Sequence, residues 1–122
     1  MIGTTQAKLI HSIRVLAFIF IIVVGGVSPA HSMYFRDYAR LKDTQEFKIF
    51  LQGIGNGYLG ANADLFVRGL PLLYCQPEGL GLGPDNYEDI LQKEIKRKKH
   101  VEPDTLVTIL LLSGLKNTFP CK

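Results

Sequence analysis

Apolar residues recur at intervals of three and four after Asp43, which is the spacing of one face of an α-helix. Asp43 is followed three residues later by Glu46, the pattern of a capping box, so we expect Asp43 to be the N-cap. Glycines interrupt this helix, and each weakens it by about 1 kcal/mol relative to alanine. We interpret them as points where another helix packs closely or where this helix bends. The apolar stripe comprises Phe47, Phe50, Leu51, Ile54, Tyr58, Ala61 and Leu65, and the glycines are Gly53, Gly55, Gly57 and Gly60.

Three other segments also have helical patterns. A short helix is expected over residues 33–42, and an amphipathic surface helix over residues 87–100, capped by Asp85 or Asn86. A last helix over residues 103–119 would hold Pro103 in its first turn, with Asp104 at its positive end. Prolines and glycines make residues 70–86 mainly a loop. No strand pairs or repeats are evident, so the predicted fold is all-α, a small bundle of about four helices.

The last helix is apolar on nearly every side, and such a helix must be buried on every side. A small subunit has too little material to cover it, which favours a homodimer. The residues expected at the dimer interface are Leu106, Ile109, Leu110 and Leu111.

The N-terminal segment has the three parts of a secretory signal peptide. Lys8 and Arg14 precede an apolar run at residues 15–27, and small residues follow it. We expect residues 1–32 to be removed by cleavage after Ser32, with Ala30 as the other candidate. An uncleaved membrane anchor is the alternative, although the run is shorter than the roughly 20 residues that span a bilayer. If the segment is cleaved as expected, the protein contacts the membrane only transiently, through the signal peptide.

Residues 33–122 would form a single domain of 90 residues. They contain 12 of the 14 basic and all 11 acidic residues, so their net charge is only about +1. Two cysteines in an exported chain favour a disulfide between Cys75 and Cys121, with two buried free thiols as the alternative. Closing a loop of this length would stabilise the domain by roughly 4 kcal/mol in the chain-entropy model.

The sequence offers little material for catalysis. Gly55, Gly57 and Gly60 satisfy G-x-G-x-x-G, but a helical pattern precedes them where a dinucleotide site requires a strand. After Ser32 the chain contains one histidine, His100, and one serine, Ser113, which we expect to bond to its own helix backbone. These residues predict neither a catalytic triad nor a zinc site. We therefore expect a protein that is not an enzyme and needs no metal or cofactor.

The strongest charge feature is the basic run from Lys96 to His100. Cations at a helix C-terminus are usually solvated and oppose the negative end of the helix dipole. A partner with an acidic cleft or an anionic membrane surface would also suit the run. Export argues against nucleic acid as a partner.

Four segments, taken in order and spacing, resemble the Tai-type immunity proteins, closest to those of the fourth amidase effector group. The segments are "QGIGNGYLGAN", "YCQPEG", "PDN…ILQKEIKR" and "VEPDTLVTILLLSGLKNTFPC", which together cover about residues 47–121. These proteins protect bacteria against peptidoglycan amidases delivered by type VI secretion. The resemblance implies an all-α periplasmic dimer that binds the amidase and blocks its catalytic cleft.

Two surfaces are candidates for binding the amidase. The first is the loop anchored by the predicted disulfide, with glycines that allow close approach to a narrow cleft and carboxylates that suit a cysteine–histidine site. Its candidate residues are Gln76, Glu78, Leu80, Leu82, Asp85 and Asn86. The second is the neighbouring amphipathic helix, with Lys93, Lys96, Arg97 and Lys99. The loop could instead merely connect two helices.

Two other functions fit the same features. A periplasmic holdase-type chaperone is also small, helical and disulfide-bonded, and dissociation of its dimer at low pH would expose the apolar helix. A membrane-tethered accessory subunit would retain the N-terminal segment.

Overall fold

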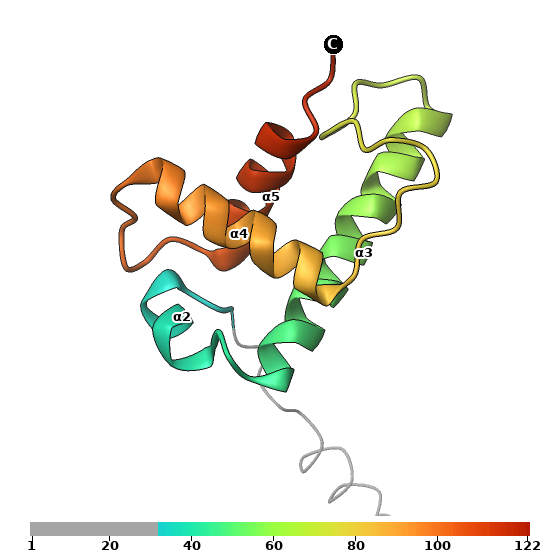
Figure 1. The fold of residues 1–122 in the computed structure, drawn as a ribbon. Coiled ribbons are helices and arrows are strands. Elements are labelled where there is room, and N and C mark those ends of the chain that lie inside the picture. Colours follow the sequence, from blue (N-terminus) through green and yellow to red (C-terminus); the bar gives the residue numbers. More distant parts are fainter. Residues whose placement is uncertain (1–31) are drawn as a thin grey trace, which may run out of the picture. The chain divides into compact units, whose positions relative to one another are not determined.

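The computed structural model describes residues 32–122, which form one unit with four helices (Figure 1). Helix α2 spans Phe35–Leu41, α3 spans Gln45–Val67, α4 spans Pro84–Lys98 and α5 spans Val107–Thr118. Within this part of the chain, the only β-type pairing is an isolated bridge between Tyr34 and Leu106. The prediction of an all-α fold with about four helices is confirmed. The predicted signal peptide lies outside the described residues, apart from Ser32, so its cleavage stays a prediction.

The observed N-caps of α3 and α4 differ from the predicted ones. Thr44, and not Asp43, caps α3, because its hydroxyl accepts a hydrogen bond from the Phe47 amide at 3.2 Å. Helix α4 begins earlier than predicted, with Gly83 as N-cap and Pro84 as first helical residue. Asn86 lies inside α4 and accepts a hydrogen bond from the Gly83 amide at 2.8 Å. A proline suits this first position because its missing N–H would have no partner within the helix.

Helix α5 also begins at a different point from the predicted one. Pro103 and Asp104 precede it, and the helix starts only at Val107. The backbone before the helix pairs with the segment that leads into α2, since the Phe35 amide donates to the Thr105 carbonyl at 2.8 Å. The Val107 amide donates to the Met33 carbonyl at 3.0 Å. These bonds hold residues 105–106 in an extended conformation. Tertiary hydrogen bonding therefore prevents the helix from starting at Pro103, where the sequence predicts its first turn.

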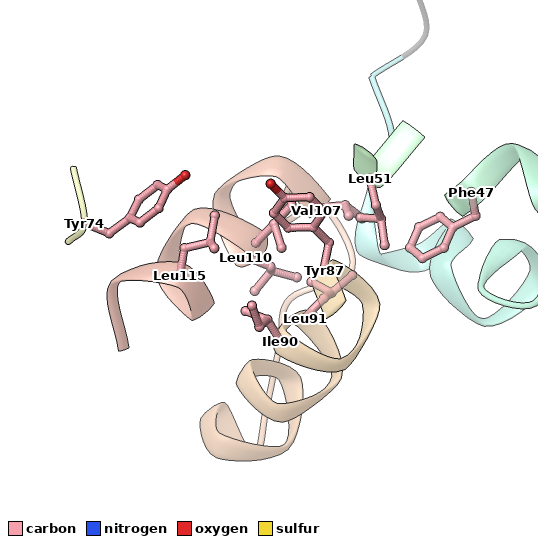
Figure 2. Packing of buried hydrophobic residues seen from close by; sticks show 10 residues of the cluster. Phe47, Leu51, Tyr74, Tyr87, Ile90, Leu91, Val107, Leu110 and Leu115 are labelled. Carbon is pink, nitrogen blue, oxygen red and sulfur yellow. The ribbon is translucent and has the colours of Figure 1, made fainter. Parts of the chain in front are cut away.

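The apolar core lies where α3, α4 and α5 pack against one another (Figure 2). Tyr74 adds a ring from the connection between α3 and α4, and Phe35 and Tyr38 of α2 pack at the edge. The fully enclosed apolar residues are Phe47, Leu51, Tyr74, Tyr87, Ile90, Leu91, Val107, Leu110, Leu111 and Leu115.

The burial of α5 corrects the predicted dimer interface. Leu110 and Leu111 are 1% and 0% exposed within the single subunit, so neither can contact a second copy. The argument that one subunit could not cover α5 is wrong for these two residues, because α4 packs along the helix. Ile109 stays 58% exposed and Leu106 is half-buried.

One of the four α3 glycines is a point of close helix packing. A Cβ atom on Gly55 would lie 2.1 Å from the Cζ atom of Tyr87. The aromatic ring of Tyr87, which belongs to α4, therefore packs directly against the α3 backbone at Gly55. Within residues 32–122, Gly53, Gly57 and Gly60 have no neighbour within 4 Å of the same position, and packing in this part of the chain does not explain them. Gly114, which the sequence did not single out, provides a second close contact, against Ile90 of α4.

Within residues 32–122, no helix is both long enough and apolar enough to cross a membrane.

We expect Gly55→Ala to lower the free energy of unfolding by about 1–3 kcal/mol, because the new methyl group overlaps the Tyr87 ring. Gly57→Ala is the matched control, and it should stabilise the protein by about 1 kcal/mol, because the position is an open helix interior. Urea unfolding of the two variants measures both effects. A Gly55→Ala variant as stable as Gly57→Ala would contradict the packing described.

Candidate functional site

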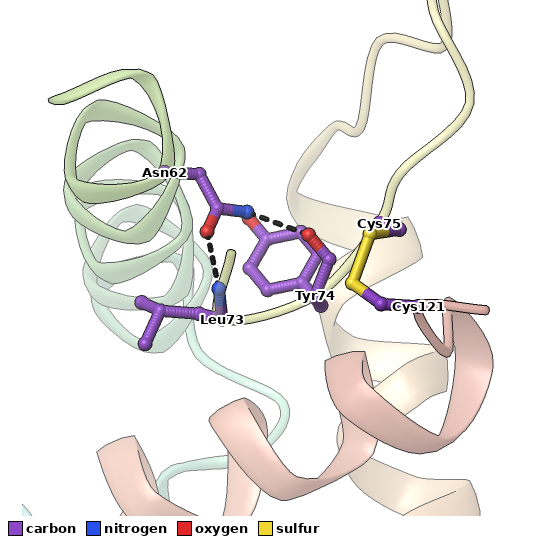
Figure 3. The surroundings of a disulfide bond; sticks show 5 residues. All are labelled: Asn62, Leu73, Tyr74, Cys75 and Cys121. Carbon is purple, nitrogen blue, oxygen red and sulfur yellow. Dashed lines mark hydrogen bonds between the residues drawn. A yellow bond between two sulfur atoms is a disulfide. The ribbon is translucent and has the colours of Figure 1, made fainter. Parts of the chain in front are cut away.

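The connection between α3 and α4, residues 68–83, is joined covalently to the segment after α5. Cys75 and Cys121 form a disulfide with a Cα–Cα distance of 4.9 Å, as predicted (Figure 3). The Cys75 amide also donates to the Phe119 carbonyl at 2.8 Å, and the rings of Tyr74 and Phe119 pack together. The middle of the connection is therefore tied to the end of α5.

Asn62 of α3 holds the same connection from its other side (Figure 3). Its Oδ1 accepts from the Leu73 amide at 2.7 Å, and its Nδ2 donates to the Tyr74 carbonyl at 2.9 Å. The side chain is only 8% exposed, so both bonds are largely shielded from water. The sequence analysis missed Asn62, although its place four residues after Tyr58 on the apolar stripe was a usable signal.

Beyond these anchors the connection forms a tight turn from Pro77 to Leu80. The Leu80 amide donates to the Pro77 carbonyl at 3.1 Å, and Gly79 has a φ of +76°. A positive φ at the third position is typical of a type II turn and favours glycine. Glu78 therefore lies at the tip with an exposed side chain. No basic side chain of residues 32–122 lies within ion-pair distance of its carboxylate.

An open hollow of about 450 Å³ lies between this turn and α3. Leu59 of α3 lines it and is 49% exposed, and Leu80 of the turn lines it and is 42% exposed. Phe66 lies two helical turns after Leu59, on the same side of α3, and is 75% exposed. We call this region the α3–turn surface, comprising Leu59, Phe66, Gln76, Pro77, Glu78, Gly79, Leu80 and Gly81.

The six predicted loop residues lie in three different places. Gln76, Glu78 and Leu80 line the hollow, whereas Leu82 packs against the core. Asp85 and Asn86 belong to the first turn of α4, so the predicted extension of the loop to Asn86 is wrong. The Asp85 carboxylate accepts from Lys48 Nζ at 2.7 Å, and Asn86 bonds to Gly83.

The predicted basic residues of α4 have different surroundings. Lys93 pairs with Asp89 at 2.6 Å, and Arg97 pairs with Glu94 at 2.8 Å, although both basic side chains stay largely exposed. Lys99 follows the last residue of α4. Lys96 is exposed and lines a second hollow of about 310 Å³ together with Tyr38, Lys42, Gln92 and Ile95. Exposed positive charge without an ion pair among residues 32–122 is therefore found at Lys96 in α4 and at Lys99 directly after it.

A buried carboxylate joins α4 to α5. Glu94 is 2% exposed, and its two oxygens accept from Arg97 at 2.8 Å, from Ser113 at 2.7 Å and from Asn117 at 2.8 Å. The hydrogen bonds from Arg97, supported by those from Ser113 and Asn117, outweigh burial and lower the pKa of Glu94 to about 2. The expectation that Ser113 bonds to its own backbone is wrong, because Glu94 comes within reach from α4. Glu94 was also missed, although it lies three residues after Leu91 on the apolar stripe of α4.

The described residues 32–122 contain no group of three or more histidine, cysteine, aspartate or glutamate side chains that could hold a metal ion. Comparisons with models of known protein families, with curated proteins and with solved structures find no match for this chain. The turn from Pro77 to Leu80, the exposed carboxylate of Glu78 and the exposed side chain of Leu59 lie together around the hollow.

We expect Asn62→Ala to lower the free energy of unfolding by about 1–3 kcal/mol, because it leaves the Leu73 amide and the Tyr74 carbonyl without partners. Hydrogen exchange at the Leu73 amide should become faster in the same variant. Asn56→Ala is the control, since Asn56 is exposed on the same helix and bonds only to Gln52. Equal stability of the two variants would show that Asn62 does not anchor the connection.

The pKa of Glu94 predicts a specific dependence of stability on pH. The folded-state pKa of about 2 lies below the ordinary value of 4.5, so the stabilisation is complete above pH 4.5 and is lost as the pH falls towards 2. Glu94→Gln should flatten this part of the curve and lower stability at pH 7 by about 1.5–3 kcal/mol. Urea unfolding between pH 2 and 7 tests this, with the exposed Glu46→Gln as control. An unchanged pH profile in Glu94→Gln would contradict the assignment.

Proposed function

We propose that the protein is an exported immunity protein of the Tai type, which binds a type VI-secreted peptidoglycan amidase in the periplasm and occludes its catalytic cleft. The observation that carries the proposal is the turn from Pro77 to Leu80, which is held at its base and exposes Glu78 at its tip. The resemblance to Tai-type proteins, noted from the sequence, supplies the identity of the partner. The proposal includes no catalytic role for the chain.

Rigidity of the connection supports inhibition by insertion. A flexible loop loses conformational entropy when it becomes ordered in a complex, and this loss weakens binding. A segment that is already ordered loses less entropy on binding. The disulfide and the two Asn62 hydrogen bonds limit the movement of residues 73–75 before any partner arrives. Gly79 and Gly81 have open space where a Cβ atom would lie, so another backbone can approach the turn closely.

The charges of Glu78 and of the α4 lysines also support binding of the amidase at this surface. A catalytic cysteine is activated when a neighbouring histidine is positively charged. The Glu78 carboxylate, which has no basic partner among residues 32–122, can accept a hydrogen bond from such an imidazolium. The exposed lysines of α4 would steer an acidic part of the amidase surface towards the complex.

A homodimer is part of the proposal, but with fewer α5 residues than the sequence analysis expected. Ile109 is exposed and Leu106 is half-buried, so these two residues are available to a second copy. Leu110 and Leu111 belong to the subunit core and serve the fold.

The proposal is tested by mixing the disulfide-bonded protein with purified peptidoglycan amidases of the type VI effector groups and measuring cell-wall hydrolysis. We expect a stoichiometric complex and loss of hydrolysis with one of them. Glu78→Ala should weaken inhibition about 10- to 100-fold, the usual effect of losing a hydrogen bond to a charged group. Glu46→Ala, an exposed acidic residue in the first turn of α3, is the control and should inhibit fully.

The basic residues of α4 should act in a different way. Lys96→Glu is expected to slow association, more strongly at low salt, and to leave dissociation nearly unchanged, because exposed charges act mainly on the on-rate. Full inhibition by a folded protein that lacks residues 78–81 would contradict insertion of the turn. Failure to bind any amidase, together with suppression of aggregation at low pH, would favour the chaperone instead.

A further inference from the structure

The hollow beside the turn has features that insertion of Glu78 into a cleft does not use. Leu59 and Leu80 both line it, one from α3 and one from the turn, and both stay nearly half exposed. Exposed leucines alone are common on protein surfaces, but two that line the same concave space are available to bind an apolar group. The volume of about 450 Å³ lies in the range of about 300–1,000 Å³ that is usual for ligand pockets.

The polar atoms of the hollow are incompletely paired. Gln76 donates its Nε2 to the Leu80 carbonyl, but its Oε1 is shielded from solvent and has no hydrogen-bond partner within the described chain. Among residues 32–122, Glu78 is the only charged residue that lines the hollow. Because the Gln76 Oε1 is shielded from solvent, an occupant of the hollow does not reach it. The carboxylate of Glu78, which has no cation beside it, favours an occupant that brings positive charge.

We propose that this hollow receives a large apolar side chain of the partner protein, and that a lysine or arginine beside it in the partner pairs with Glu78. The inference rests on the proposed function in taking the amidase as that partner. It adds a second mode of contact, because the immunity protein would receive a side chain of the enzyme next to the turn that enters the cleft. A carboxylate has two acceptor oxygens, so Glu78 can accept from this cation and from the catalytic imidazolium at the same time. A buried apolar anchor beside a charge pair is a common source of affinity in protein interfaces.

A second copy of this chain is a less suitable occupant. The chain does expose an apolar–basic sequence, Phe66-Val67-Arg68, at the end of α3. Arg68, however, already pairs with Asp64 at 3.1 Å, so that guanidinium would have to leave its partner to reach Glu78. Filling the hollow in this way would also cover the turn that the proposed function requires to be free.

The first experiment probes the hollow without any amidase. A phage library of random 12-residue peptides is selected on the disulfide-bonded protein, and peptides with a large apolar residue next to lysine or arginine should be enriched. Their affinity should fall at least 10-fold in Leu59→Asp and in Glu78→Lys. Ile49→Asp is the matched control, because Ile49 is an exposed aliphatic residue on the same helix, 63% exposed against 49% for Leu59, and lies outside the hollow, so the variant should bind as the wild type does.

The second experiment uses the inhibited amidase itself. Leu59→Asp should weaken the complex at least 10-fold while the protein keeps its unfolding temperature, and Leu80→Asp is the substitute if Leu59→Asp fails to fold. An amidase that is inhibited equally by wild type and Leu59→Asp would overturn this inference and leave the proposed function intact. If no amidase binds, the proposed function fails, and the peptide selection still reports on the hollow.

Three further results of these experiments would overturn the inference. The first is a selection that enriches no apolar–basic peptides. The second is a set of enriched peptides whose affinity is unchanged in Leu59→Asp. The third is a change from dimer to monomer on sedimentation of Leu59→Asp, which would assign the hollow to a second copy.

Discussion

The disulfide between Cys75 and Cys121 is the constraint on which the candidate surface depends. Beyond Gly55, Asn62 is the only α3 residue that is buried, so this half of the helix has few core contacts of its own. Tyr58 links it to α5, because its hydroxyl donates to the Thr108 carbonyl at 2.8 Å, and the connection that Asn62 binds and the disulfide fixes provides a further link. A covalent tie is most valuable where a small domain has little core to spare.

A buried polar network supports the other side of the subunit. Glu94 satisfies both of its oxygens with donors from α4 and α5, so burying its charge leaves no unmet hydrogen bond. Leucine at this position would pack in many registers, whereas the carboxylate requires Ser113 and Asn117 to face it. The close contact at Gly114 then brings the α5 backbone against Ile90. Together these contacts define how α5 lies on α4 and where Cys121 meets Cys75.

These two supports do not involve Glu78, Leu59 or Phe66 of the α3–turn surface. Glu78 pairs with no other charge in the described chain, and Leu59 and Phe66 are 49% and 75% exposed. The carboxylates that do serve the fold, Asp85 and Glu94, have partners within the subunit. A surface whose side chains are not needed for stability can vary with its partner, and such surfaces are where binding specificity resides.

The sequence by itself determined the helical segments, the irregular connection between α3 and α4, and the disulfide. Hydrophobic periodicity and the positions of prolines and glycines are local properties of the chain, and two cysteines allow only one pairing. The sequence did not determine the caps at Thr44 and Gly83 or the start of α5, since those depend on which neighbouring backbone supplies partners. It placed Gln76, Glu78 and Leu80 in the connection between two helices, because prolines and glycines mark a turn wherever they occur. It missed Asn62, Leu59 and Phe66 and assigned Leu110 and Leu111 to an interface. A helical period shows which residues share a face, and only the packing of the other helices decides which faces are covered.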